Sequence, residues 1–354
     1  MIYIDGSQME GGGQILRTAL ALSTLTRQAF IIKKIRDNRP APGLKAQHLS
    51  CIDALKRLAS AEVQGAQLGA LGLCFNPHSV VSGKLVLDIG TAGSITLLLQ
   101  SLLLPCMFAD GAIKLCVTGG TDTKWSIPAD YFIHVILPFL NKFATVEIND
   151  IRRGFYPRGR GKLDLTIIPR LHLNAYQDFD DFHAQLRNRI PPVQFMMPPE
   201  LDHIEGRSVA SFKLKAAGVA ERQAEGAARV FGDRYHLRID REYCHSASVG
   251  TVITLWAVSR QGVVFMGADA LGEKGRRAED VGAAAAGRLL NALKSGAAVD
   301  RHLADNLIPL MALCGGEIKT EEISGHIRSN IDVCEKFLEV KFRVDEAQNT
   351  VTVN

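Results

Sequence analysis

A repeated order of short strand, glycine-rich turn and helix is the feature of this sequence that most constrains its fold. The order occurs in IDGSQMEGGGQILRTALALSTLT and again, about eighty residues later, in LDIGTAGSITLLLQSLLLP, where we expect a strand at 84–89, a turn at 90–94 and a helix from Ser94. A looser third copy is AVDRHLADNLIPLMALCGG. A second helix and further strands follow each copy, as GLKAQHLSCIDALKRLA follows the first. Repetition on this scale predicts an α/β fold built from repeated modules.

Two segments interrupt the repetition. Residues 172–203 carry four prolines in two pairs and little periodicity, which is typical of a linker or an excursion. The residues after them read as strand, helix, strand and strand, and an alanine-rich helix then ends at Gly296. We therefore predict a core domain made of residues 1–200 and 298–354, with an inserted α/β domain at 201–297.

Composition and charge limit the classes of protein that need to be considered. The seven cysteines form no C-x-x-C pair and are odd in number, which predicts reduced thiols in a cytoplasmic protein. The net charge of +4 permits a nucleic-acid partner without indicating one. The N-terminus has no secretory signal, and the most apolar run, ITLLLQSLLLPCMF, is too short to span a bilayer, so we expect no membrane association.

The stretch MEGGGQILRTALALS places three glycines directly before an expected helix. It lacks the lysine of a Walker loop, and Leu16 stands where a dinucleotide-binding fingerprint needs its third glycine. Backbone N–H groups at a helix start still attract an anion, and a divalent metal would reconcile that anion with the carboxylate of Glu10. The alternative is a tight turn in which Glu10 is simply an exposed acid at a helix start.

Two further places carry residues suited to phosphate chemistry. Arg36 and Arg39 lie in an expected loop, and arginine forks suit phosphate oxygens, although such pairs are often only solvated surface. His326 lies in EEISGHIRSN, where serine and asparagine side chains offer hydrogen-bond partners. A lone histidine of this kind is more often a surface residue than a nucleophile, so the residues alone leave both alternatives open.

The sequence resembles the RNA 3′-terminal phosphate cyclase family from residue 5 to about 340. The resemblance rests on DGSQMEGGGQILRTALALS, RPAPGLKAQHL, GTAGSITLLLQ, GGTD…PADYF, RRGFYPRGRG, LGEKGRRAED, HLADNLIPLMAL and SGHIRSNI, in the family's order. It implies three repeated βαβαββ modules, each similar to the C-terminal domain of translation initiation factor three, and an inserted, smaller thioredoxin-like α/β domain. The fold class expected is therefore α/β, or α+β.

The resemblance also implies an activity, the ATP-dependent conversion of an RNA 3′-phosphate into a 2′,3′-cyclic phosphate. This is ligase chemistry, in which a histidine aligned with His326 becomes covalently adenylylated and passes AMP to the RNA end. A neutral imidazole is a good nucleophile near neutral pH. The implied partners are ATP, Mg²⁺ or Mn²⁺ and an RNA with a 3′-phosphate; the oligomeric state stays open, with a homodimer as one alternative.

The resemblance assigns roles to particular residues. Glu10 would hold the metal, and the residues of the phosphate and RNA-end site would be Gln14, Arg17, Arg36, Arg39 and Gln47. The residues of the ATP site would be Gln100, Pro128, Tyr131, His302, Leu303, Ala304, Asp305 and Asn306. Family members carry Tyr-Leu-Ala-Asp-Gln where this chain has the segment 302–306, so a preference for ATP over GTP is left open.

Two other classes of protein share this resemblance. A cyclase-like protein that acts in ribosome assembly without catalysis would lack the nucleophilic histidine, and His326, Glu10 and Arg17 argue against it. An enolpyruvyl-transferase-like enzyme would need a set of arginines and lysines for phosphoenolpyruvate that the sequence does not show.

Overall fold

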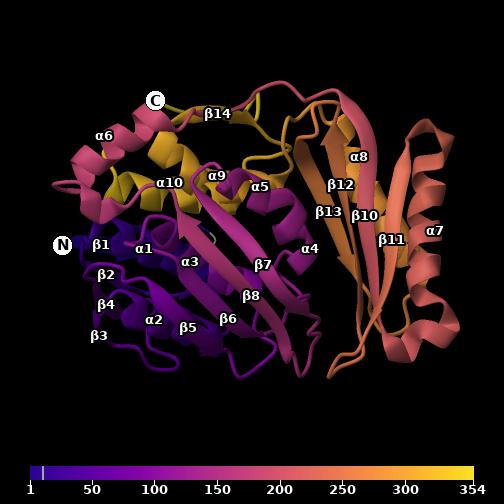
Figure 1. Cartoon of the computed structure of the whole chain (residues 1–354), viewed down its shortest axis with the longest axis horizontal. Coiled ribbons are helices and arrows are strands. Elements are labelled where there is room, and N and C mark those ends of the chain that lie inside the picture. Colours follow the sequence, from indigo (N-terminus) through magenta and orange to yellow (C-terminus); the bar gives the residue numbers. More distant parts are fainter. Residues whose placement is uncertain (10–11) are drawn as a thin grey trace.

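Four sheets of four strands each organise residues 1–9 and 12–354, the part of the chain that the computed structural model describes (Figure 1). The first sheet has the order β1-β2-β4-β3, with β1 and β2 parallel and the other neighbours antiparallel. Its elements are β1 (Ile2–Asp5), α1 (Gly13–Thr26), β2 (Phe30–Lys33), α2 (Ala46–Leu58), β3 (Glu62–Gln64) and β4 (Leu73–Asn76).

The second sheet repeats this arrangement of strands, with the order β5-β6-β8-β7 and only β5 and β6 parallel. Ser94 accepts a hydrogen bond from the N–H of Leu97 and so caps the helix after β5, where the sequence predicts a helix start. The elements are β5 (Gly83–Asp88), α3 (Ile95–Cys106), β6 (Ile113–Gly119), α4 (Ala129–Tyr131), the π-helix η1 (Phe132–Ile136), α5 (Leu137–Leu140), β7 (Ala144–Arg152) and β8 (Gly161–Pro169).

The third sheet shows that the interpretation of residues 172–203 as a linker is wrong. This segment contains α6 (Phe179–Arg189) and β9 (Val193–Phe195), and β9 pairs in parallel with β14 (Gly316–Lys319). The sheet order is β15-β16-β14-β9, again with one parallel pair and two antiparallel pairs. The remaining elements are the 3₁₀-helix η2 (Leu173–Ala175), α9 (Arg301–Cys314), α10 (Gly325–Phe337), β15 (Phe342–Asp345) and β16 (Thr350–Val353).

The fourth sheet lies between β9 and α9 in the sequence and has the order β11-β10-β12-β13. Its strands are β10 (Leu201–Ser211), β11 (Leu237–Cys244), β12 (Thr251–Ser259) and β13 (Val264–Leu271), so the last predicted strand is in fact a hairpin of two. Its helices are α7 (Val219–Phe231) and α8 (Ala278–Lys294), with 3₁₀ turns η3 (Phe212–Ala217) and η4 (Gly232–Arg234). Figure 1 shows this sheet at one end of the molecule, with both chain termini in the rest.

Two hydrophobic clusters match this arrangement. One large cluster joins the first three sheets with α1, α3, α9 and α10, which pack against one another. A second cluster lies within residues 204–297, between the fourth sheet and the helices α7 and α8. We keep the division into 1–200 with 298–354 and 201–297 as a proposal on this basis; the likeness to the initiation-factor and thioredoxin domains stays a prediction. In the described part of the chain, we find no helix with the length and apolar character needed to cross a membrane.

Candidate active site

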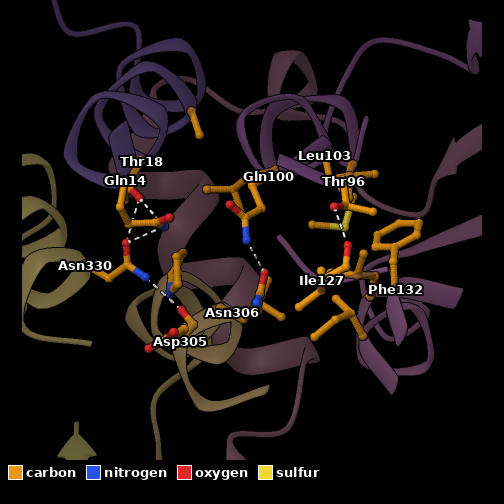
Figure 2. Close-up of a pocket in the computed structure, with 17 residues that line it drawn as sticks. Gln14, Thr18, Thr96, Gln100, Leu103, Ile127, Phe132, Asp305, Asn306 and Asn330 are labelled. Carbon is orange, nitrogen blue, oxygen red and sulfur yellow. Dashed lines mark hydrogen bonds between the residues drawn. The ribbon is translucent and has the colours of Figure 1, made fainter. Parts of the chain in front are cut away.

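Amide side chains and the guanidinium of Arg17 connect four helices beside the start of α1, and Figure 2 shows the amides. Arg17 donates from Nη2 to Oε1 of Gln14 (2.6 Å) and from Nε to Oε1 of Gln100 in α3 (3.2 Å). Gln100 in turn donates to Oδ1 of Asn306 in α9 (3.1 Å). Gln14 donates to Oδ1 of Asn330 in α10 (3.0 Å). The structure therefore brings together four of the residues that the resemblance assigns to the phosphate and ATP sites, Gln14, Arg17, Gln100 and Asn306.

His326 is the second residue of α10 and not a loop residue. Ser324 caps this helix by accepting from the N–H of Ile327 (3.1 Å), and its hydroxyl donates to Oδ1 of Asp305 (2.7 Å). One turn after His326, Ser329 contacts the sulfur of Met9 (3.7 Å) and Asn330 binds Gln14. Residues three and four apart share a helix face, so His326 lies on the face of α10 that meets the start of α1.

Cations surround the described part of the glycine turn. An Nη atom of Arg39 would lie 3.3 Å from a Cβ atom on Gly12, and an Nη atom of Arg17 would lie 3.0 Å from one on Gly13. The same Cβ on Gly13 would collide with Nε2 of His48. Glycine is needed at position 13 because the His48 ring occupies the space of a Cβ atom, and two arginine side chains lie close around the turn. Glu10, the predicted metal ligand, lies outside the described residues.

His48 is a site residue that the sequence alone does not reveal. Its side chain is buried, and Nδ1 accepts a hydrogen bond from the backbone N–H of Lys45 (3.0 Å). Burial, and then the positive charges of Arg17, Arg36 and Lys45, lower its pKa to about 3. The ring is therefore neutral at pH 7, with its proton on Nε2, the atom that faces Gly13. It offers an uncharged donor inside a cationic site.

Arg36 and Gln47 lie further from the amide chain. Arg36 has a left-handed backbone (φ 57°) and donates from Nη1 to the carbonyl oxygens of Ala41 (3.0 Å) and Gly43 (3.3 Å), so it orders its own loop. Burial, followed by the charge of Arg39, lowers its pKa. Cβ of Gln47 would lie 3.6 Å from a Cβ atom on Gly93, which places Gln47 beside the second glycine-rich turn.

Tyr131 and His302 meet at the start of α9. The Tyr131 hydroxyl donates to both oxygens of Asp300 (2.6 and 2.8 Å), and its ring lies edge-on to that of His302 with centroids 6.1 Å apart. Asp300 also accepts from the N–H groups of His302 and of Gly267 in β13. Burial raises the pKa of both Asp300 and Tyr131. Tyr131 is fully buried, so it supports His302 and does not face an open site.

The remaining predicted residues of the ATP site divide into two groups. Leu303 and Ala304 are fully buried in α9 and pack in the core. Pro128 caps the start of α4, and Asp305 holds α10 through Ser324 and Asn330. Burial, followed by the charge of Arg301, lowers the pKa of His302 to about 4, so His302 is neutral at pH 7.

Two cavities adjoin these residues. The cavity in Figure 2 has a volume of about 60 Å³ and is mostly apolar, with Gln14, Gln100, Asp305 and Asn306 at its polar end. A polar cavity of about 290 Å³ lies between the fourth sheet and α9, lined by Gly267, Ala268, Asp269, Arg288, Asn291, Ala292, Asp300, Arg301, His302 and Glu321. Burial raises the pKa of Asp269 there to about 7. The second cavity approaches the size of a small-molecule site, on the order of 300 Å³.

The described residues contain no group of three or more histidine, cysteine, aspartate or glutamate side chains that would enclose a metal ion. Mg²⁺ does not require such a group, since it commonly binds one or two carboxylates together with substrate phosphates. Among the described residues, Arg17 and Arg39 lie close to the turn and suit phosphate oxygens.

Comparison with known proteins agrees with these observations. The family model described as RNA 3′-terminal phosphate cyclase matches residues 8–344. The chain is 42% identical to the RNA 3′-terminal phosphate cyclase of Pyrococcus furiosus, over 97% of this chain and 95% of that protein. It is 42% identical to that of Archaeoglobus fulgidus, over 96% of each, and 41% identical to that of Methanosarcina mazei, over 100% and 99%. The chain belongs to the RNA 3′-terminal phosphate cyclase family.

Proposed function

We propose that this protein uses ATP to convert an RNA 3′-phosphate into a 2′,3′-cyclic phosphate through a covalent adenylate on His326. One observation supports this most directly. The hydrogen bonds of Asn330 and Ser329 hold the face of α10 that carries His326 against the start of α1, where Arg17, Arg39 and His48 gather around the glycine turn. A nucleophile thereby stands beside an anion site.

The chemistry follows in three displacements at phosphorus. A nitrogen lone pair of neutral His326 attacks the α-phosphorus of ATP, so a P–N bond forms, the P–O bond to pyrophosphate breaks, and the imidazole proton is lost. An oxygen of the RNA 3′-phosphate then attacks the same phosphorus and breaks the P–N bond. Finally the 2′-hydroxyl attacks the terminal RNA phosphorus, loses its proton and expels AMP. Covalent capture divides one difficult activation into easier steps.

The surrounding residues stabilise the charge that develops on phosphate. Arg17 and Arg39 supply fixed positive charge, and Nε2–H of His48 supplies a neutral donor. His302 stays neutral and offers its ring to adenine at the edge of the polar cavity, which would take the nucleoside. We propose a cytoplasmic location, since all seven cysteines are free thiols.

Labelling with ATP radioactive at the α-phosphate tests the proposal. Wild-type protein with Mg²⁺ or Mn²⁺ should acquire label that is labile to acid and stable to alkali, as a phosphoramidate is, and H326N should acquire none. H172N is a control, because the His172 ring binds the carbonyl oxygen of Ala109, which is not one of the proposed site residues, and should label normally. Absence of label on the wild type would contradict the mechanism and favour the non-catalytic alternative.

The proposed role of Glu10 as a metal ligand can be tested by replacing this residue. We expect Glu10→Ala to label poorly at low Mg²⁺ and to recover partly as Mg²⁺ is raised, because one of few metal ligands is lost. Titrations of label against Mg²⁺ for the two proteins measure this shift. Coincident titration curves would mean that Glu10 is only a residue of the turn.

A further inference from the structure

We propose that a surface of three loops, residues 121–127, 153–160 and 272–277, binds the single-stranded RNA segment that precedes the reacting 3′ end. We name it the loop surface. Trp125 would stack on a base, and the arginines and lysines around it would meet backbone phosphates. The inference rests on the proposed function, which supplies an RNA end at the neighbouring site.

Trp125 is the most exposed large apolar side chain among the described residues. It is 93% exposed, whereas Trp256, the second tryptophan of the chain, is 4% exposed. Its backbone lies in the left-handed region (φ 63°), which is strained for a bulky residue. The turn is held by the Ser126 hydroxyl, which donates to the carbonyl of Thr123 (3.0 Å). A strained turn that presents an indole to solvent points to a binding role.

The loop that carries Trp125 leads directly into the candidate active site. Two residues later, Ile127 lines the cavity of Figure 2, and its carbonyl accepts from Thr96 of α3 (2.8 Å). Pro128 then begins the helix that carries Tyr131, the residue that supports His302. An RNA chain that leaves the active site past this loop therefore meets Trp125 within a few residues of the site.

The second loop packs against the first and adds another exposed aromatic ring. Backbone hydrogen bonds run from Thr121 and Asp122 to the carbonyl of Gly154 (3.0 and 3.4 Å). Phe155 is buried, which turns Tyr156 outward at 75% exposure. Exposed arginines follow at Arg158 and Arg160, and neither guanidinium forms an ion pair within the described residues.

The third loop comes from the fourth sheet and is joined to the first by an ion pair. Lys124 contacts Glu273 at 2.8 Å, with both side chains about half exposed. Next to Glu273 the loop exposes three cations, at Lys274, Arg276 and Arg277. The loop surface thus combines outward aromatic rings with flanking positive charge on both sides.

This combination favours single-stranded RNA over other partners. Proteins that bind single strands pair aromatic stacking platforms with a basic path for the backbone. Stacking on an exposed indole requires a base with a free face, which a duplex does not present, whereas the last nucleotides of a single-stranded end do. A protein partner would be expected to cover a contiguous apolar patch, yet the residues around Trp125 are mostly charged.

Binding of a labelled RNA of about ten nucleotides with a 3′-phosphate, measured by fluorescence anisotropy without ATP, tests the proposal. We expect Trp125→Ala to weaken binding roughly five-fold or more and Trp125→Phe to retain most of it. Intrinsic fluorescence of the wild type should be quenched by unlabelled RNA, and Trp125→Phe should lose that quenching. Tyr3→Ala is a matched control, since Tyr3 is 68% exposed on β1, away from the loop surface.

Salt dependence tests the charges separately. Replacing Arg158 and Arg160 together by glutamine should reduce the slope of log affinity against log salt by about one to two. Unchanged RNA affinity in Trp125→Ala would overturn the proposal. A loss of ATP labelling equal to the loss of RNA binding would also overturn it, because the loop would then shape the nucleotide site. If the wild type binds RNA through Trp125 but never labels, the proposed function fails while the loop surface stands.

Discussion

At the residue scale, the site depends on keeping histidines uncharged among cations. His48 accepts a backbone hydrogen bond through Nδ1 and lies against Arg17 and Gly13, so protonation would add a buried like charge. A neutral imidazole can donate a hydrogen bond from its N–H group to a phosphate oxygen, and the ring keeps that proton when the ligand leaves. Burial and the neighbouring charge of Arg301 keep His302 neutral in the same way.

The depressed pKa of His48 predicts how stability depends on pH. The pKa of His48 is about 3 in the folded protein, and its ordinary value is 6.5. Between these two values the unfolded chain binds a proton at this histidine and the folded protein does not. Stability from this group is complete above pH 6.5 and is lost as pH falls toward 3. Between pH 7.5 and 5.5 the loss should be about 1.4 kcal/mol.

Urea unfolding of the wild type and of His48→Asn at the two pH values measures this contribution. Asparagine keeps an acceptor near the position of Nδ1 but does not titrate, so the variant should lose about 1.4 kcal/mol less than the wild type on acidification. An identical loss in both proteins would show that His48 is not a neutral buried group.

At the scale of elements, the contact between α1 and α10 positions His326, the proposed nucleophile. Asn330 is buried, accepts from Gln14 (3.0 Å) and Thr18 (2.7 Å), and donates to the carbonyl of Asp305 (2.8 Å). It therefore fixes α10 against α1 and α9 one turn beyond His326. Loss of this amide would leave its hydrogen-bond partners on α1 and α9 unsatisfied.

Replacing Asn330 by alanine should lower the free energy of unfolding by about 1–3 kcal/mol and slow labelling by ATP. Gln28→Ala is the matched control, because Gln28 joins the same two helices through the carbonyl of Phe337 (3.2 Å) but is exposed and at their far ends. We expect that variant to stay within about 0.5 kcal/mol of the wild type and to label normally. Equal changes in the free energy of unfolding and in labelling for the two variants would mean that the packing of α1 against α10 tolerates a shift near His326.

Sequence patterns could predict the parts of the fold whose determinants are local. The helix start at Ser94 and the helix after the first glycine turn follow from caps, glycines and periodicity within one segment. The strand Val193–Phe195 could not be predicted in this way. It has only three residues between proline pairs, and its partner Gly316–Ile318 lies beyond the whole of 201–297.

The same distinction applies to the candidate site. Gln14, Arg17 and Gln100 lie in motifs that the resemblance identifies, and their mutual hydrogen bonds agree with a shared site. His48 and Asn330 carry no local signal of function, because their roles come from contacts with helices far away in the sequence. The sequence offers one hint of the role of His48. This histidine stands three residues after Lys45, the residue that precedes the helix, so its Nδ1 can accept a hydrogen bond from the Lys45 backbone.

At the scale of the whole molecule, buried charges join the fourth sheet to the rest. Asp130 is fully buried and binds Arg153 at 2.8 Å through both oxygens, and Arg207 of β10 approaches it at 3.5 Å. Beside this cluster, the rings of His134 and Trp256 stack with centroids 4.1 Å apart. The walls of the polar cavity also come from both sides of this junction, from β13 and α8 on one side and α9 on the other.

Removing the buried carboxylate should be costly. We expect Asp130→Asn to lower the free energy of unfolding by about 3 kcal/mol, because Arg153 would keep only Asp122, at 3.5 Å, as a close buried partner. Glu200→Gln breaks an exposed pair with Arg260 instead and should change stability by less than about 1 kcal/mol. Chemical denaturation compares the two, and similar values would contradict a structural role for the buried cluster.

The late pairing of β9 has a consequence for how the chain is made. On the ribosome the first two sheets have all their strands once residue 169 has emerged, whereas β9 must wait until β14, at 316–319, has been synthesised. Domains generally fold as units during synthesis, so the segment 201–297 can collapse around its own hydrophobic cluster in the interval. The helix that carries His326 follows β14, so the proposed nucleophile can take its place only after the distant partner of β9 has been synthesised.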